Sequence, residues 1–297
     1  MSRKHILVTG STGQLGRSLQ MIAGQYPEFE FHFFNRSRLD LATPGVVHAC
    51  LEDHAFDYLI NCAAYTAVDR AETEPELAEQ INHHAVAALA EAARKKGTCL
   101  IHISTDYVFD GCHYKPYAED HPTAPINQYG QTKLHGEQAI QRSGVDACIV
   151  RTSWVYSEFG NNFVKTMLRL GQERERLTVI NDQVGTPTYA GDLATAIMAL
   201  VRRRESQPVE SGCKVFHYSN EGVCSWYDFA LEIFDMQPLQ CRVDPIDTVN
   251  YPTPARRPYY SVLNKNAFRD YTGVDVPHWK HSLNICLSRL KDAAKNG

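Results

Sequence analysis

Tyr129 and Lys133 form the pair of side chains in this sequence best suited to acid–base chemistry. They stand four residues apart in a segment, 127–142, whose pattern predicts a helix. Residues four apart lie on one face of a helix, so the phenol and the ammonium can point into the same space. A phenol has a pKa of about 10 in water, and a nearby ammonium lowers it. We therefore predict that Tyr129 is a proton donor whose pKa Lys133 lowers, with the hydroxyl of Thr105 tuning it further.

A glycine-rich turn near the N-terminus predicts a phosphate-binding site. Its spacing, GxxGxxG, directly follows an apolar strand over 5–9 and opens a predicted helix over 13–23. The first glycine permits the tight turn, the second lets the backbone approach a pyrophosphate, and the third lets the helix pack against the sheet. The free N–H groups at the positive end of the helix then hold the anion. We expect a dinucleotide to bind the residues of this turn, which are Gly10, Ser11, Thr12, Gly13, Gln14, Leu15 and Gly16.

The end of the second predicted strand, 29–34, bears on which dinucleotide binds. An acidic residue that binds the ribose 2′-hydroxyl of NAD is expected there, but this sequence has Asn35 and Arg36. The guanidinium of Arg36 suits a 2′-phosphate. Arg38 could bind that phosphate in place of Arg36 or compete with Arg36 for it. We therefore expect NADPH to be preferred, with NADH as the other cofactor accepted.

Two more motifs follow predicted strands. One is the loop Ala63, Ala64, Tyr65 and Thr66, which we expect to line the cofactor, and the other begins at Thr105 and Asp106. A single Tyr-x-x-x-Lys pair or a single glycine turn arises readily by chance. Their order along this chain, namely glycine turn, loop, Thr-Asp and then Tyr-x-x-x-Lys opening a helix, does not, and it indicates one catalytic arrangement.

The helices and strands that must position these residues are those of an α/β fold. Apolar strands at 5–9, 29–34, 58–62, 99–103 and 147–150 alternate with helices at 13–23, 75–96 and 127–142. This alternation predicts a Rossmann-type doubly wound parallel sheet covered on both faces. The less regular second half, with helices at 162–175, 191–204, 225–236 and 276–295 and a strand at 215–218, predicts a smaller C-terminal substrate-binding lobe. We place the NAD(P)-binding lobe at 1–158, with returning segments near 190–220, and the mainly substrate-binding lobe at 159–297.

In these motifs the chain resembles the extended short-chain dehydrogenase/reductase superfamily, and more closely its dTDP-4-dehydrorhamnose reductase family. The resemblance runs from the first strand almost to the last helix. It is carried by the segments 10–16, 61–69, 71–76, 104–111, 129–134, 151–156, 160–163, 182–188 and 251–258. The later segments matter most, because they lie in the substrate half and are not general to the superfamily.

The resemblance implies a reaction and the residues that perform it. NAD(P)H would deliver hydride to the C4 keto carbon of dTDP-4-dehydro-L-rhamnose, and Tyr129 would protonate the oxygen. Lys133 would hold the nicotinamide ribose, and Asp40 and Leu41 would lie against the adenine. The substrate would contact side chains of both lobes, with Arg257 favoured over Arg256 for the diphosphate. These substrate-binding residues are Thr105, Asp106, Trp154, Asn162 and Arg257.

Composition narrows the other classes of function. The net charge of −4 shows no basic excess for nucleic acid, and no apolar run is long enough to cross a membrane. Nine dispersed cysteines fit reduced thiols, so we expect a cytoplasmic protein. The expected partner is the small nucleotide-sugar substrate, and we leave a homodimer open.

We predict no metal ligands. None of the thirteen histidines, His83 and His84 included, forms an HExxH motif or a set clustered along the chain. Some relatives bridge two subunits through a metal held by acidic residues, but Ser18 occupies the first of those positions here. Asp192 could serve at the second and Asp292 near the C-terminus, so the metal bridge is in doubt.

Two rival functions stay open. One is a reductase or epimerase of another nucleotide 4-keto sugar. Dehydration is disfavoured, because Tyr107 follows Asp106 where sugar dehydratases of this superfamily carry an acidic residue. The other rival is a non-catalytic regulatory subunit that resembles the one of methionine adenosyltransferase.

Overall fold

The computed structural model describes residues 3–52, 54–206 and 211–295. Its centre is a six-stranded sheet in the order β10-β5-β4-β3-β1-β2, with every neighbouring pair parallel. The strands are β1 (Lys4–Thr9), β2 (Phe29–Phe33), β3 (Tyr58–Asn61), β4 (Cys99–Thr105), β5 (Ala147–Thr152) and β10 (Cys213–His217). The chain leaves β1 for β2 on one side and returns to β3 on the other. Ligands bind at such a switch point, beyond the carboxyl ends of the strands.

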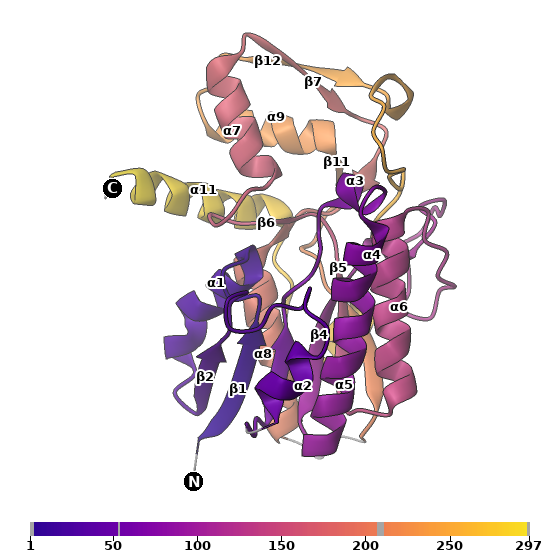
Figure 1. Cartoon of the computed structure of the whole chain (residues 1–297). Coiled ribbons are helices and arrows are strands. Elements are labelled where there is room, and N and C mark those ends of the chain that lie inside the picture. Colours follow the sequence, from indigo (N-terminus) through magenta and orange to yellow (C-terminus); the bar gives the residue numbers. More distant parts are fainter. Residues whose placement is uncertain (1–2, 53, 207–210, 296–297) are drawn as a thin grey trace.

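Helices cover both faces of this sheet, as predicted (Figure 1). Alternate residues of β1 point to opposite faces, so Ile6 and Val8 join one apolar cluster and Leu7 joins the other. The first cluster includes side chains of α1 (Gln14–Ile22), α8 (Ala190–Ser206) and α10 (Asn266–Thr272). The second includes side chains of α2 (Val46–Leu51), α5 (Ala85–Lys96) and α6 (Gln128–Ser143).

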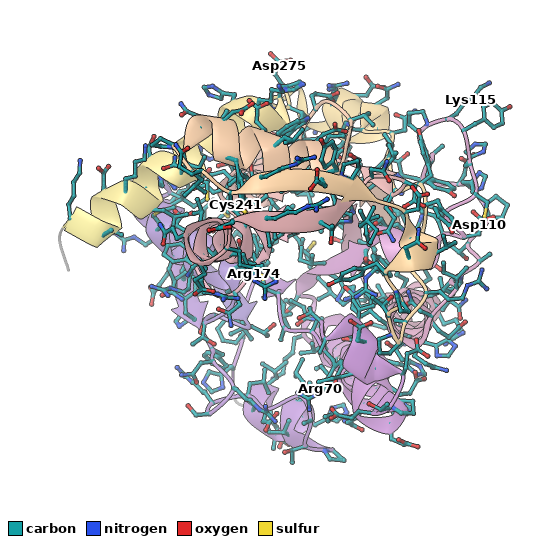
Figure 2. All side chains as sticks on the ribbon, turned by 90° about the horizontal axis from the view of Figure 1, so that it is seen from above. Arg70, Asp110, Lys115, Arg174, Cys241 and Asp275 are labelled. Carbon is teal, nitrogen blue, oxygen red and sulfur yellow. The ribbon has the colours of Figure 1, made fainter. Side chains whose placement is uncertain are left out.

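The remaining elements form the smaller lobe that lies above the carboxyl edge of the sheet (Figure 1). Its helices are α7 (Phe163–Glu173), α9 (Trp226–Met236) and α11 (Trp279–Lys295), and its strand pairs are β6 (Val155–Tyr156) with β9 (Thr188–Tyr189), β7 (Arg176–Ile180) with β12 (Arg242–Ile246), and β8 (Val184–Gly185) with β11 (Cys224–Ser225). Figure 2 shows Arg174 and Cys241 near each other, just before the parallel strands β7 and β12. The intervening α8 and β10 belong to the sheet lobe.

Short elements connect these parts. They are α3 (Val68–Ala71), α4 (Pro75–Glu79), the π-helical turn η2 (Gln80–His84), and the 3₁₀ turns η1 (Ala23–Gln25), η3 (Asp106–Val108) and η4 (Thr248–Asn250). Among the described residues, no helix combines the length and the apolarity needed to cross a membrane.

The predicted helix over 75–96 is present as one helical run made of α4, η2 and α5. The finding that was not predicted is the π-helical turn in its middle, and Asn82 of that turn is buried. Its side chain accepts a hydrogen bond from the backbone N–H of Tyr65 at 2.9 Å and donates one to the carbonyl of Tyr65 at 3.0 Å. The extra residue in the turn lets this amide reach inward without breaking the helix. The strands β7 and β12 and the short helices α2 and α10 were not predicted, because each is too short to show a clear period.

Candidate active site

The glycine turn after β1 has the geometry of a phosphate cradle. Gly10 has φ +62°, and a Cβ on it would lie 2.7 Å from the backbone nitrogen of Ala63. A Cβ on Gly16 would overlap the carbonyl oxygen of Gly10 and lie 2.6 Å from the Cα of Ser11. Glycine is therefore required at both positions, because the turn is packed against β3 on one side and against α1 on the other.

The helix that follows the turn begins with free N–H groups. Gly13 is the N-cap of α1, and within the described chain no side chain caps it; the first turn also carries no acidic residue. An uncapped helix start beside a closely packed glycine turn fits the pyrophosphate of a dinucleotide. Of the other predicted turn residues, Ser11 and Leu15 are buried and Thr12 is exposed. Leu15 packs in the core, so it can offer only its backbone.

Gln14 links the cradle to the smaller lobe. Its Oε1 accepts hydrogen bonds from Ser157 Oγ and from Asn162 Nδ2, both at 3.0 Å. Its Nε2 donates to the carbonyl of Val155 at 3.3 Å. The side chain of Gln14 therefore fixes where the two lobes meet, and any contact of Gln14 with a cofactor would come from its backbone.

The segment after β2 leaves Arg36 accessible. Its side chain is 76% exposed and its Nε lies 3.1 Å from Asp40 Oδ2. Such an exposed pair contributes little stability, so the guanidinium can move toward a ligand. Arg38 instead stacks on the ring of Phe34, with 3.7 Å from its Cζ to the ring centroid. Asn35 accepts hydrogen bonds from Ser37 and Arg38 within the loop, and Leu41 is buried.

The loop after β3 lies beside the glycine turn. The backbone N–H of Ala63 donates to Thr9 Oγ1 at 3.3 Å, and Asn82 holds the backbone of Tyr65. Ala64 is partly exposed and Thr66 is exposed. The loop thus forms a second wall of the site at the switch point between β1 and β3.

Tyr129 lies beside Thr105 because α6 approaches the end of β4 closely. A Cβ on Gly130, the next residue, would overlap the carbonyl oxygen of Tyr107. Burial raises the pKa of Tyr129 to about 12; a hydrogen bond with Thr105 lowers it, and the carboxylate of Asp106 raises it. The predicted lowering of this pKa by Lys133 was therefore wrong for this structure. The phenol stays protonated across the physiological range, as a general acid must.

Lys133 lies at the bottom of the site, 1% exposed. Its Nζ donates to the carbonyl oxygen of Ile103 at 2.6 Å and lies 3.3 Å from His102 Nε2. The network continues from His102 Nδ1 to the amide of Asn61 at 3.1 Å and on to the hydroxyl of Thr9 at 2.6 Å. Burial lowers the pKa of Lys133 to about 8, which Glu137 partly opposes. Buried polar partners therefore fix the position of this ammonium one helical turn from Tyr129.

Asp106 is a buried carboxylate with an open acceptor. Thr105 Oγ1 donates to its Oδ1 at 3.0 Å, while Oδ2 has no hydrogen-bond partner among the described residues. Burial raises the pKa of Asp106 to about 6, and the nearby hydroxyl groups of Ser261 and Thr105 oppose that shift. An unpaired buried oxygen is costly, so it suits a hydroxyl group that arrives with a ligand.

Trp154 has the strained backbone of a functional position. Its φ of +48° is the only positive value at a non-glycine residue of the described chain. Such conformations cost about 1–3 kcal/mol and concentrate at ligand sites. One face of its ring stacks on Trp226, with centroids 3.6 Å apart, and its edge lies over Gly185. Trp226 at the start of α9 was not predicted, and only the fold reveals it.

The other two predicted substrate ligands are engaged with protein groups. Asn162 caps α7 through Lys165 N at 3.2 Å, and its Nδ2 donates to Gln14, Ser157 and Phe159. Arg257 forms a two-pronged pair with Asp69, at 3.0 and 2.7 Å. The pair holds the pKa of Asp69 below its usual range. Nucleotide binding by Asn162 and Arg257 therefore stays a prediction.

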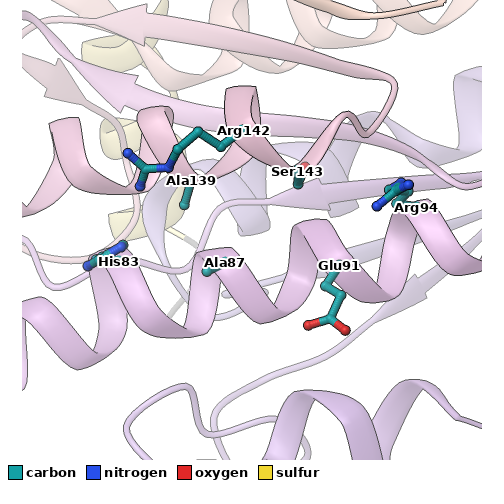
Figure 3. Close-up of a pocket in the computed structure, with 7 residues that line it drawn as sticks. All are labelled: His83, Ala87, Glu91, Arg94, Ala139, Arg142 and Ser143. Atoms are coloured by element: carbon teal, nitrogen blue, oxygen red, sulfur yellow. The ribbon is translucent and has the colours of Figure 1, made fainter.

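Two of the histidines lie in a cluster that chain order did not reveal, and the prediction of no metal ligands stays a prediction. His83 and His84 do belong to a cluster of possible metal ligands, because the fold brings Glu79 beside both of them. Figure 3 shows a groove on the outer side of α5 and α6 with His83 at one end. Its lining residues are His83, Ala87, Glu91, Arg94, Ala139, Arg142 and Ser143. None of them is a predicted catalytic or cofactor residue, so the groove is separate from the active site.

Together the switch-point cradle, the Tyr129–Lys133 pair and the Thr105–Asp106 step define an oxidoreductase of the short-chain dehydrogenase/reductase class. A profile of the family described as RmlD substrate binding domain matches residues 4–292. The dTDP-4-dehydrorhamnose reductases of Sinorhizobium fredii and Escherichia coli are 42% and 41% identical to the chain; the matches cover 93% and 96% of it, and 94% and 98% of those proteins. The chain belongs to the dTDP-4-dehydrorhamnose reductase family.

Solved structures agree in fold. The dTDP-4-dehydrorhamnose reductase of Bacillus anthracis, in complex with NADP, has a TM-score of 0.90 and 38% identity, and the match covers 97% of this chain and 100% of that one. The Clostridium acetobutylicum ortholog has the same TM-score at 39% identity, with 97% and 99% covered. The predicted α/β fold and family are confirmed.

Proposed function

We propose that this protein reduces the C4 keto group of dTDP-4-dehydro-L-rhamnose to the hydroxyl of dTDP-L-rhamnose, with NAD(P)H as reductant and Tyr129 as proton donor. The observation that carries the proposal is the position of Tyr129. Its protonated phenol contacts Thr105 and lies one helical turn from the buried Lys133, at the sheet edge where the glycine cradle opens. The names of the relatives support the substrate.

The cradle fits a nicotinamide dinucleotide, and a relative of known structure is complexed with NADP. When bound, NADPH supplies the hydride. Arg36, 76% exposed, supports a preference for the 2′-phosphate of NADPH, and Asp40 and Leu41 are placed on the same loop. Lys133 would leave the carbonyl of Ile103 to hold the nicotinamide ribose.

The protein's own residues would act on the carbonyl group and the sugar. Tyr129 holds its proton firmly in this structure and donates it as negative charge develops on the C4 oxygen. Thr105 orients the phenol and shares its hydroxyl with Asp106, whose free Oδ2 accepts a hydrogen bond from a sugar hydroxyl. Trp154, held by Trp226, offers the rest of its ring to a sugar face.

The nucleotide end of the substrate would reach residues of the smaller lobe. Arg257 can present its fork to the diphosphate if it exchanges Asp69 for that ligand, because a guanidinium matches phosphate oxygens in the same two-pronged way. Asn162 would contribute through the start of α7, which it caps and holds against Gln14.

The test is NADPH oxidation on addition of enzymatically prepared dTDP-4-dehydro-L-rhamnose, with the product identified by NMR. The proposal predicts one NADPH consumed for each dTDP-L-rhamnose formed. An epimerase would change the sugar without net NADPH consumption. A regulatory subunit would bind the cofactor without turnover, and a reductase of another 4-keto sugar would turn over that sugar in preference. Each of those three results would overturn the proposal.

A further inference from the structure

Side chains of the types that ligate metals gather on the outer surface where the π-helical turn η2 packs against α6. The ligating atoms of Glu79, His83 and His84 all lie within 4.8 Å of one another. His135 of α6 adjoins this group, since its Nδ1 is 2.9 Å from Glu79 Oε1, the same oxygen that lies 2.7 Å from His83 Nδ1. Two imidazoles and one carboxylate therefore form a cluster, and a third imidazole contacts the shared carboxylate.

The π-helical turn is the reason that two consecutive histidines reach one carboxylate. In a regular α-helix, residue i+4 lies above residue i while residue i+5 turns away. In a π-helix the backbone hydrogen bond joins residues i and i+5, so residue i+5 also lies above residue i. The backbone here follows that pattern, because Ala85 N–H donates to the carbonyl of Gln80. His83 and His84 therefore both flank Glu79.

The backbone under the cluster is held rigidly. A Cβ on Gly136 of α6 would overlap the carbonyl oxygen of Asn82 in the turn, so the two segments touch without any side chain between them. Asn82 also donates to Thr132 Oγ1 of α6 at 3.1 Å. Contact this close fixes His135 relative to the ligands on the turn, which a preformed metal site requires.

We propose that Glu79, His83, His84 and His135 bind one divalent transition-metal ion of the Zn²⁺ type. Imidazole and carboxylate are usual zinc ligands, and four of them complete a tetrahedral shell. With Zn–N bonds of about 2.0–2.1 Å, two tetrahedrally placed imidazoles have ring centroids roughly 5 Å apart. The ring centroid of His83 lies 4.6 Å from that of His84 and 5.3 Å from that of His135. These two pairs of rings therefore already have the spacing of imidazoles on one ion, and closing the shell requires the His84 and His135 side chains to rotate toward each other.

The side chains are also open to an arriving ion. Glu79, His83 and His135 are 27%, 21% and 35% exposed, and His84 is exposed. A bound ion would tie the turn that holds Tyr65 to the helix that carries Tyr129 and Lys133. The site is separate from the reaction centre, so the inference does not depend on the proposed function.

A second group offers a matched control. The ligand atoms of His5, Glu30 and His32 on β1 and β2 also lie within 4.8 Å of one another, and they form a group of three. Nδ1 of His5 and Nε2 of His32 are within hydrogen-bond distance of each other, at 3.1 Å. A substitution there removes a surface histidine without touching the proposed site.

The experiment is titration of the metal-free full-length protein with Co²⁺, followed by its visible d–d absorption, and then displacement by Zn²⁺. We expect one Co²⁺ per chain with the intense absorption of four-coordinate cobalt, in the wild type and in His32→Ala alike. His84→Ala and His135→Ala should each weaken binding by about tenfold to a hundredfold. Saturating Zn²⁺, at about a hundred times its Kd, should raise the Tm of the wild type by roughly 5 °C and that of His84→Ala by much less.

The matched variants make the outcome decisive. His84 is exposed, so His84→Ala should fold, and its unchanged circular dichroism checks this. Six-coordinate, weakly absorbing Co²⁺ in the wild type, or binding that survives in both His84→Ala and His135→Ala, would overturn the proposal. Loss of binding in His32→Ala alone would overturn it too, because the ion would then sit on β1 and β2.

Discussion

Thr105 donates its hydroxyl hydrogen to Oδ1 of Asp106 at 3.0 Å, while the other oxygen of that buried carboxylate has no partner among the described residues. The same hydroxyl lowers the pKa of the Tyr129 phenol. One threonine therefore lies between the proposed proton donor and a carboxylate that has an open acceptor. The unpaired buried oxygen lowers the stability of the folded protein, and this leads to a first prediction.

Replacing Asp106 with Asn should stabilise the protein above pH 6. Burial raises the pKa of Asp106 to about 6, compared with about 3.9 in an unfolded chain. The folded state thus holds the proton more tightly, and stability is lost as the pH rises from about 4 through 6. An amide does not ionise, so Asp106→Asn should gain about 1–3 kcal/mol at pH 7.5 and little at pH 4. Urea unfolding at both pH values checks this.

Asp110→Asn is the matched control with the opposite sign. The N–H of Cys112 and the hydroxyl of Tyr117 hold the pKa of Asp110 below its usual range. This variant should lose stability at pH 7.5 relative to the wild type. Equal stability of Asp106→Asn and wild type across the range would show that the carboxylate carries no buried charge.

Arg36→Ala should erase the preference for NADPH. A charged hydrogen bond to the 2′-phosphate contributes about 1.5–3 kcal/mol, which corresponds to roughly ten- to a hundredfold in kcat/KM. The measurement is kcat/KM for NADPH and NADH in the wild type, Arg36→Ala and Arg38→Ala. Because Arg38 stacks on Phe34, its variant should keep most of the preference. Equal use of both cofactors by the wild type would contradict this reading of Arg36.

Gly130→Ala should lower activity by displacing the phenol next to it. The new methyl group would overlap the carbonyl oxygen of Tyr107 and meet Pro125 Cβ at 3.1 Å, so the start of α6 must shift. We expect a loss of about 1–3 kcal/mol of stability and of about tenfold to a hundredfold in kcat. Gly24→Ala, with no atom within 4 Å of its new Cβ, should change neither. Full activity in Gly130→Ala would mean that α6 is not held as described.

Turnover should survive exhaustive EDTA treatment and dialysis. Ser18 has its hydroxyl bonded within α1 to the carbonyl of Gln14 at 3.0 Å, and Asp192 accepts hydrogen bonds from Asn220 and Ser282. Neither is placed as a free metal ligand. A large loss of activity that Mg²⁺ restores would show that a metal bridge matters after all.

Features of the fold and the site could be predicted from the sequence where residues close together in the chain encode them. The sheet lobe follows from local period and from turn chemistry, so the strands, the glycine cradle and the helix that carries Tyr129 and Lys133 were readable in chain order. The cradle is a local feature in which Gly10 and Gly16 are six residues apart. The packing of Trp154 on Trp226 and the pair of Arg257 with Asp69 join residues far apart in the chain, and no local pattern encodes them.

The π-helical turn shows the same limit. An apolar helix pattern over 75–96 is nearly unchanged by one inserted residue, so the interruption at 80–84 is invisible to periodicity, and with it the meeting of Glu79 and His84. The direction of the Tyr129 pKa was also out of reach. It depends on how completely the phenol is surrounded by protein, and burial outweighs the neighbouring groups.

The most direct test of the proposed reaction is the rate of NADPH oxidation with saturating dTDP-4-dehydro-L-rhamnose, compared between the wild type and Tyr129→Phe. The phenol of Tyr129 is the proposed proton donor, and the loss of a general acid costs about 10²–10⁴-fold. We predict a kcat reduced by that factor, with NADPH affinity, measured by fluorescence titration, within about threefold of wild type. A Tyr129→Phe enzyme that keeps near-normal kcat would contradict the assignment of Tyr129 as the proton donor.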